Sequence, residues 1–275
     1  AMSEIDTSEI DTSEIDTSEI DTSEIDTSEI DTTDVLPGRP GGRAPDVVGL
    51  DPGIRAAAQD PASQAAVELA RRDPVLARLV DRHGLPTISH RVATVTPFEG
   101  LVRSIVFQQL AGRAAAAIHG RLVTLLGGAV SAEGILAQGI DGLRTAGLSG
   151  SKAASLSDLA ARVDGGSLPL GGIHLLEDEQ VVSQLTEVRG IGRWTAEMFL
   201  IFNLGRLDVW PVGDYGVRSG YAFAWGLDEL PTARQLAPLG EPFSPFRSVA
   251  AWYCWRAVED KVAARLAGVG TRPST

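Results

Sequence analysis

The sequence has one cysteine, two lysines and no long hydrophobic run, and each shortage excludes a class of protein. The single cysteine, Cys254, excludes an internal disulfide framework and any four-cysteine iron–sulfur cluster. No run of about 18 apolar residues is present, so the usual signature of a membrane-spanning helix is missing. No charged segment followed by an apolar stretch opens the chain, so we expect no secretion signal and a cytoplasmic location.

Several familiar catalytic patterns are also missing. The four histidines have no spacing typical of zinc ligands, and no P-loop or dinucleotide-binding glycine pattern occurs. The two lysines are Lys152 and Lys261, so 24 − 2 = 22 of the basic residues are arginines. The 275 residues are enough for one large domain or two small ones.

The net charge of −12 comes from one acidic tract. Residues 3–32 are six copies of SEIDT with 12 acidic and no basic residues, and Asp34 adds one more acid. Residues 35–275 therefore carry 36 − 13 = 23 acidic and 24 basic residues, a net charge of +1. An isoleucine every five residues fits neither a helix nor a strand, so the tract is predicted to be disordered. The alternative is an acidic arm that competes with DNA for a basic groove.

The rest of the chain is predicted to be all-α. We assign residues 1–61 to the acidic tract and a linker rich in Pro and Gly, and residues 62–270 to a helical domain. The one candidate strand is weak and lies at 88–95. Helical spacing predicts helices at 63–83, 97–127 with a break near 111–112, 131–138, 140–146, 151–163, 177–188, 194–203, from about Asp214, and 246–267.

The segment VRGIGRWTAEMFL at residues 188–200 predicts a helix–hairpin–helix. Gly190 and Gly192 form a tight turn, and the following helix begins at once with unpaired N–H groups at its positive end. Such a turn can bind a phosphate, and Arg193 and Thr195 could add side-chain contacts. The alternative is a plain glycine turn between two helices.

The segment LDVWPVGDYGVR at residues 207–218 follows the second helix of the hairpin. Asp214 precedes a predicted helix start, so it could be an ordinary N-cap. It also lies 20 residues beyond Trp194, and a short helix with a return loop can bring it back beside the hairpin. A carboxylate at that place could stabilise positive charge that develops on a sugar.

Three segments together resemble one family. The stretch LTEVRGIGRWTAEMFLIFNLGRLDVWPVGDYGVRSG resembles the hairpin and catalytic Asp of the helix–hairpin–helix (HhH-GPD) DNA glycosylase superfamily, in its 3-methyladenine DNA glycosylase II branch. The stretches PFEGLVRSIVFQQLAG and PFRSVAAWYCW resemble two further helices of that branch. The resemblance implies two helical subdomains with the active-site cleft between them, and a monomer that acts on damaged double-stranded DNA beside the nucleoid of a bacterial-type cell.

The resemblance also implies roles for individual residues. Asp214 would be the catalytic carboxylate, which stabilises the oxocarbenium-like sugar and orients or activates water. Trp194 and Trp255 would line the pocket for the flipped base, because an indole face suits a cationic alkylpurine. Met198 stands where some members have an aromatic pocket residue, which leaves the base preference open. For both tryptophans the alternative is core packing.

Contacts with DNA and with a cation follow from the same resemblance. Either Gln109 or Leu110 would fill the gap that the flipped base leaves in the duplex. No cofactor would be required, but hairpin carbonyls in the family often bind a monovalent cation, Na⁺ or K⁺. The hairpin contacts would come from Gly190, Gly192, Arg193 and Thr195 for phosphate, and from the carbonyls of Thr186, Val188 and Ile191 for the cation.

The resemblance separates two reaction types. Bifunctional members have a Schiff-base lysine at the position of Trp194, and lyase chemistry needs an amine nucleophile. We therefore expect a monofunctional, metal-independent hydrolase that excises alkylated purines. The alternatives are a glycosylase for oxidised or deaminated bases and a non-catalytic protein that binds damaged DNA.

Overall fold

The computed structural model describes residues 60–86, 88, 95–110 and 112–266, and within these ranges the chain is helical and contains no strand. The all-α prediction is therefore confirmed. The acidic tract at 3–32, almost all of the linker and the interior of the candidate strand at 88–95 lie outside the described residues. None of the described helices is long and apolar enough to cross a membrane.

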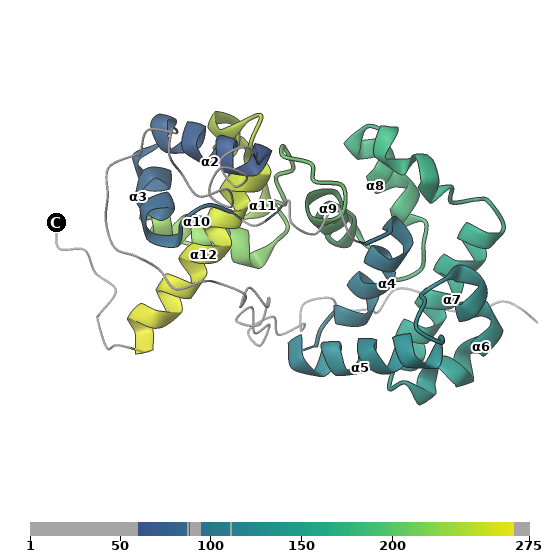
Figure 1. Ribbon diagram of the computed structural model, residues 1–275. Helices are drawn as coiled ribbons and strands as arrows, with labels where there is room; N and C mark the ends of the chain where they lie inside the picture. Colours follow the sequence, from purple (N-terminus) through teal and green to yellow (C-terminus); the bar gives the residue numbers. More distant parts are fainter. Residues whose placement is uncertain (1–59, 87, 89–94, 111, 267–275) are drawn as a thin grey trace, which may run out of the picture.

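The helices form two groups that lie side by side in Figure 1. The first group comes from both ends of the described chain, and its long helix α12 packs against α10, α3 and α2. Its members are α2 (Pro61–Arg72), α3 (Pro74–His83), α10 (Tyr215–Trp225), α11 (Ala233–Leu239), the 3-10 turn η6 (Glu241–Phe243) and α12 (Arg247–Leu266).

The second group is built from the middle of the chain. In it α6 packs against α7, α8 against α9, and α4 against α5, α7 and α9. Its members are α4 (Pro97–Phe107), α5 (Gly112–Leu125), α6 (Ala132–Thr145), α7 (Gly150–Asp164), the 3-10 turn η5 (Leu170–Leu175), α8 (Asp178–Thr186) and α9 (Arg193–Phe202). Helix α9 is drawn between the two groups in Figure 1, so the hairpin borders both.

Local sequence signals explain where several helices begin. The predicted helical segment at 63–83 is divided at Asp73, whose carboxylate accepts from the Val75 N–H at 2.7 Å while Pro74 starts α3. Proline has no N–H for a continuing helix, but its fixed φ suits a first helical position. The predicted break between 131–138 and 140–146 is present as a kink in α6 at Gly139, which has φ 62°.

Buried apolar side chains form one cluster that includes both groups. Leu76 of α3, Leu156 of α7, Phe199 of α9 and Tyr253 of α12 are all fully buried in it. Helices α10 and α12 approach closely at Gly220, where a Cβ atom would overlap the Cys254 carbonyl. A larger residue at 220 would therefore separate the two helices that carry the site described below.

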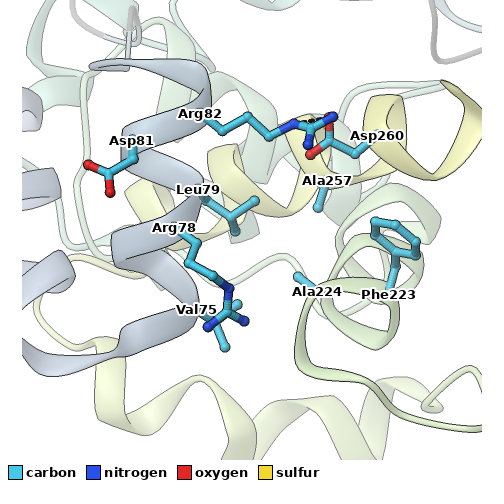
Figure 2. Close-up of a pocket in the computed structure, with 9 residues that line it drawn as sticks. All are labelled: Val75, Arg78, Leu79, Asp81, Arg82, Phe223, Ala224, Ala257 and Asp260. Atoms are coloured by element: carbon cyan, nitrogen blue, oxygen red, sulfur yellow. Dashed lines mark ion pairs between the residues drawn. The ribbon is translucent and has the colours of Figure 1, made fainter. Parts of the chain in front are cut away.

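A groove of about 500 Å³ lies between α3, α10 and α12 (Figure 2). An ion pair between Arg82 and Asp260 at 2.8 Å spans it. Its α10 residues come from the last turns of the helix, whereas Asp214 precedes the first turn, so this groove is separate from the predicted site. The lining residues are Val75, Arg78, Leu79, Asp81, Arg82, Phe223, Ala224, Ala257 and Asp260.

Candidate active site

The predicted hairpin is present as α8, a tight turn and α9. Gly190 has φ +76°, and a Cβ atom there would overlap the hydroxyl of Ser155 on α7. Only glycine adopts this conformation without strain, and only a hydrogen fits against Ser155. The turn is therefore seated on α7, which the sequence pattern did not indicate.

A carboxylate of α7 fixes the orientation of the same turn. The Asp158 carboxylate accepts the Arg189 N–H at 2.8 Å and pairs with Arg162 at 3.0 Å. The Arg189 N–H, followed by Arg162, holds the pKa of the Asp158 carboxyl below its usual range. The hairpin is thus fastened to α7 by a charge-assisted hydrogen bond next to Gly190.

The first turn of α9 has the properties of an anion site. Its N-cap is Gly192, which provides no side-chain cap, is exposed, and has open space where a Cβ atom would lie. The backbone N–H groups of a helix start carry partial positive charge and bind phosphate oxygens well. Gly190 and Gly192 thus present exposed backbone, as the phosphate prediction requires.

Two side chains predicted to contact phosphate are engaged within the protein. The Arg193 guanidinium forms ion pairs with Glu179 of α8 and with Glu197 one turn along α9. The Thr195 side chain is buried, and its hydroxyl lies 3.2 Å from the amide of Gln108. A phosphate contact by Arg193 would have to share or displace these carboxylates, so the backbone is the more available phosphate ligand in this turn.

Asp214 lies at the centre of the site and is held by three N–H donors. Its Oδ2 accepts the indole N–H of Trp194 at 2.6 Å, and its Oδ1 accepts the indole N–H of Trp255 at 3.0 Å. Its Oδ1 also accepts the Val217 N–H at 2.7 Å, which makes Asp214 the N-cap of α10. The N-cap prediction is therefore confirmed, and Asp214 lies beside the hairpin, but its catalytic role stays a prediction. A carboxylate accepts and does not donate, so three N–H donors suit it and fix its direction.

The two tryptophans differ in exposure. Trp194 is 46 % exposed at the start of α9, whereas Trp255 is 8 % exposed on α12. Trp255 stacks on Phe202 with ring centroids 5.6 Å apart, and Gly216 leaves room for its indole, because a Cβ atom at 216 would lie 2.8 Å from Trp255 Cδ1. Trp255 is therefore held in place by Phe202, whereas Trp194 is half exposed beside the carboxylate.

A second carboxyl group is buried close to Asp214. Glu197 is 6 % exposed, and its Oε1 lies 3.1 Å from Arg193 Nε. Burial raises the pKa of the Glu197 carboxyl, and the nearby Glu179 and Asp214 raise it further. The guanidinium of Arg193 opposes this shift but is shared with Glu179, so the effect of burial prevails.

These features agree with comparisons to known proteins. The chain matches the HhH-GPD superfamily of base excision DNA repair proteins over residues 102–245, a range that begins within α4 and contains the hairpin and Asp214. The chain belongs to the HhH-GPD superfamily. Within it, the DNA-3-methyladenine glycosylase 1 of Schizosaccharomyces pombe is 34 % identical over 197 residues, which are 70 % of this chain and 86 % of that protein.

Solved structures of the superfamily have the same architecture. The 3-methyladenine DNA glycosylase of Schizosaccharomyces pombe in complex with abasic DNA has a TM-score of 0.64 and 33 % identity, and covers 76 % of this chain and 100 % of its own. The DNA-3-methyladenine glycosidase of Bacillus halodurans also has a TM-score of 0.64, with 34 % identity, and covers 75 % of this chain and 93 % of its own. The expected fold of the HhH-GPD superfamily is therefore confirmed.

Other predicted site residues have defined places in this HhH-GPD fold. Gln109 and Leu110 follow the end of α4 and are exposed, as a wedge into DNA requires. Met198 is half-buried one turn beyond Trp194 and packs on the core, so its place in a base pocket stays a prediction.

The cation site of the hairpin also stays a prediction. The residues concerned, Thr186, Val188 and Ile191, belong to one chain reversal, and the Val188 carbonyl accepts the Ile191 N–H at 3.1 Å. That bond uses one of the two lone pairs of the oxygen, so carbonyl coordination of Na⁺ or K⁺ remains chemically suitable there.

Sequence reasoning missed two residues that hold the site together. Gln108 donates from its amide to the Gly190 carbonyl at 2.9 Å, and Lys152 donates to the carbonyls of Val106 and Gln108 at 2.7 and 2.6 Å. The one signal in the sequence is the pair of glutamines at 108–109, and the wedge prediction concerns only Gln109 of this pair. Lys152 had no local signal, because it lies more than 40 residues from both partners in sequence.

Proposed function

We propose that this protein is a monofunctional DNA glycosylase that hydrolyses the N-glycosidic bond of alkylated purines in double-stranded DNA. The observation that carries the proposal is the Asp214 carboxylate, which two indole N–H groups hold beside the hairpin turn. Its relatives named DNA-3-methyladenine glycosylase support the substrate class. The cytoplasmic location beside the nucleoid is part of the same proposal, because that is where the substrate lies.

The charge of the lesion explains how this site can work without a strong acid. An alkylated purine such as 3-methyladenine carries a positive charge, and it becomes neutral when the C1′–N bond breaks and the electron pair leaves with the base. The sugar then has oxocarbenium character, and a fixed negative charge stabilises it without reorganisation. Water adds to C1′ and releases a proton, which leaves an abasic site.

The exposed indole of Trp194 supplies a recognition surface for the base. Its single N–H is used by Asp214, so its orientation is fixed, and the residue is about half exposed. A cationic purine over an indole face gains stacking and cation–π attraction, worth about 0.5–2 kcal/mol. A neutral purine gains only stacking, so this surface favours the charged lesion.

The lysines support a hydrolase without lyase activity. Burial lowers the pKa of the Lys152 ammonium, a property that amine nucleophiles share. Its Nζ, however, donates to two backbone carbonyls, and the Nζ of Lys261 donates to Ser219 Oγ at 2.9 Å. Both amines are engaged elsewhere, and Trp194 stands where bifunctional members have their lysine.

Base release from a methylated duplex tests the proposal. We expect the protein to release 3-methyladenine and to leave an intact strand that breaks only after alkaline treatment. Strand breaks without alkali would contradict the monofunctional mechanism. Binding without release would support a protein that binds damaged DNA without catalysis. Release of oxidised or deaminated bases, but not of 3-methyladenine, would support a glycosylase for those bases.

A further inference from the structure

The end of α4 is fastened by a side chain from another helix. Lys152, in the first turn of α7, donates from Nζ to the Val106 carbonyl at 2.7 Å and to the Gln108 carbonyl at 2.6 Å. Helix α4 has no basic residue in its own last turn. The ammonium therefore supplies the positive charge that the carbonyl end of this helix favours.

The side chain of Gln108 fastens the same point to the hairpin. Its Nε2 donates to the Gly190 carbonyl at 2.9 Å and to Thr195 Oγ1 at 3.2 Å. Gln108 is therefore held through its backbone by α7 and through its side chain by the turn that presents the phosphate site. Two elements that would grip DNA are joined at one residue.

The next residue shows why such fastening is needed. Gln109 has φ 54°, and it is the one non-glycine residue with positive φ among the described parts of the chain. This left-handed conformation is unfavourable for a residue with a side chain, so it persists only where the surroundings impose it. The direction of the exposed side chains of Gln109 and Leu110 therefore depends on this backbone conformation.

We propose that Lys152 and Gln108 are positioning residues that lock the Gln108–Leu110 loop onto the hairpin, so that the wedge and the phosphate grip act as one rigid unit. The inference rests on the proposed function, because it assigns the loop to base extrusion. Neither residue is placed against the reacting bond. Their effect is to hold the wedge where it replaces the extruded base, which lowers the cost of ordering it on binding.

The proposal predicts a loss that depends on the form of the DNA. Extrusion from a duplex requires unpairing and unstacking of the base, whereas a base in a single strand is already unpaired. Removing the contacts of Lys152 or Gln108 should therefore slow excision from a duplex and leave the chemical step at Asp214 unchanged. A residue with a purely structural role would slow both substrates alike.

The experiment compares Lys152→Met and Gln108→Ala with wild type under single-turnover conditions, on one methylated base in duplex and in single-stranded DNA. We expect the excision rate of each variant to fall about 10-fold or more on the duplex and less than about 2-fold on the single strand, because only the duplex requires extrusion. The double variant should lose no more than the larger single loss, because the two residues act as a unit. The control is Lys261→Met, which removes the other lysine and should leave both rates unchanged.

Equal losses on both substrates, or no loss on the duplex, would overturn the proposal. Thermal unfolding shows whether each variant folds. If Lys152→Met does not fold, the rates of Gln108→Ala alone test the proposal. A second readout separates this proposal from the proposed function. The fluorescence of 2-aminopurine in a bound duplex should rise with wild type and rise less with both variants, even if wild type releases no base.

Discussion

The hydrogen bonds at Asp214 define what this residue can do. Both oxygens accept N–H donors, and one of the donors belongs to the half-exposed Trp194. A carboxylate held in this way is better suited to act as a fixed negative charge than as a mobile base. The site was predictable at this residue because Asp214 lies in a contiguous motif. The indole contacts were not, because Trp255 comes from α12, 41 residues further along the chain.

The buried Glu197 carboxyl should make the stability of the protein depend on pH. Its pKa is raised in the folded protein, mainly by burial, so the folded state favours the protonated form. That contribution to stability is present below the unfolded pKa and is lost as the pH rises through the folded pKa. We expect Glu197→Gln, which is neutral at every pH, to gain stability relative to wild type as the pH rises from about 4 to 7.

Chemical denaturation of both proteins across this pH range measures the difference. Glu179→Gln is the matched control, because Arg193 lowers the pKa of Glu179 and its variant should show the opposite trend or none. A Glu197→Gln variant that loses stability relative to wild type as the pH rises would show that the ion pair with Arg193 outweighs burial.

At the scale of elements, the two glycines of the hairpin lie in different environments, so their substitution should have different effects on stability and DNA binding. Gly190 has positive φ and touches Ser155, whereas Gly192 has φ −90° and open space around it. We expect Gly190→Ala to lower the free energy of unfolding by about 1–3 kcal/mol and to weaken DNA binding. We expect Gly192→Ala to lose less stability than Gly190→Ala and to weaken DNA binding, because its new methyl group would occupy open space at the exposed helix start where phosphate is predicted to bind.

Denaturant titration and binding to a duplex with an abasic site measure both quantities. Equal stability of Gly190→Ala and wild type would contradict the contact with α7. Unchanged DNA affinity in both variants would remove the hairpin from the DNA interface.

The elements were largely predictable from periodicity and from punctuation by Gly and Pro. Helices at the hairpin, after Asp214 and at the end of the described chain lie where expected, because each has a strong apolar pattern. The short helix α11 was missed, since Pro238 within it argues against a helix. The contacts of Gln108 and Lys152 at the end of α4 were missed for a different reason, because they are long-range and leave no local pattern.

At the scale of the whole molecule, the chain order explains how the site forms. The two groups of helices meet where α9 brings Trp194 to an aspartate and a tryptophan of the other group. The order of elements could be predicted from the sequence, but the ion pair between Arg193 and Glu179 could not, because Glu179 lies on the preceding helix.

The charge of the whole chain leads to a prediction about DNA affinity. Residues 3–32 contribute 12 negative charges, whereas residues 35–275 are close to neutral. If the tract competes with DNA, its deletion should tighten binding at low salt, and the gain should shrink as salt screens the charges. A scrambled tract of the same composition should behave like wild type, and equal affinity with and without the tract would exclude the competition.

The most direct test of the account is the single-turnover rate of 3-methyladenine release from a methylated duplex by Asp214→Asn. Asparagine keeps one acceptor oxygen but removes the charge, so we expect a loss of at least about 100-fold while DNA affinity changes little. The matched control is Asp60→Asn, another N-cap aspartate, which lies at the start of α2 and should keep the wild-type rate. Release by Asp214→Asn at a rate close to that of wild type would contradict the claim that this carboxylate stabilises the departing sugar.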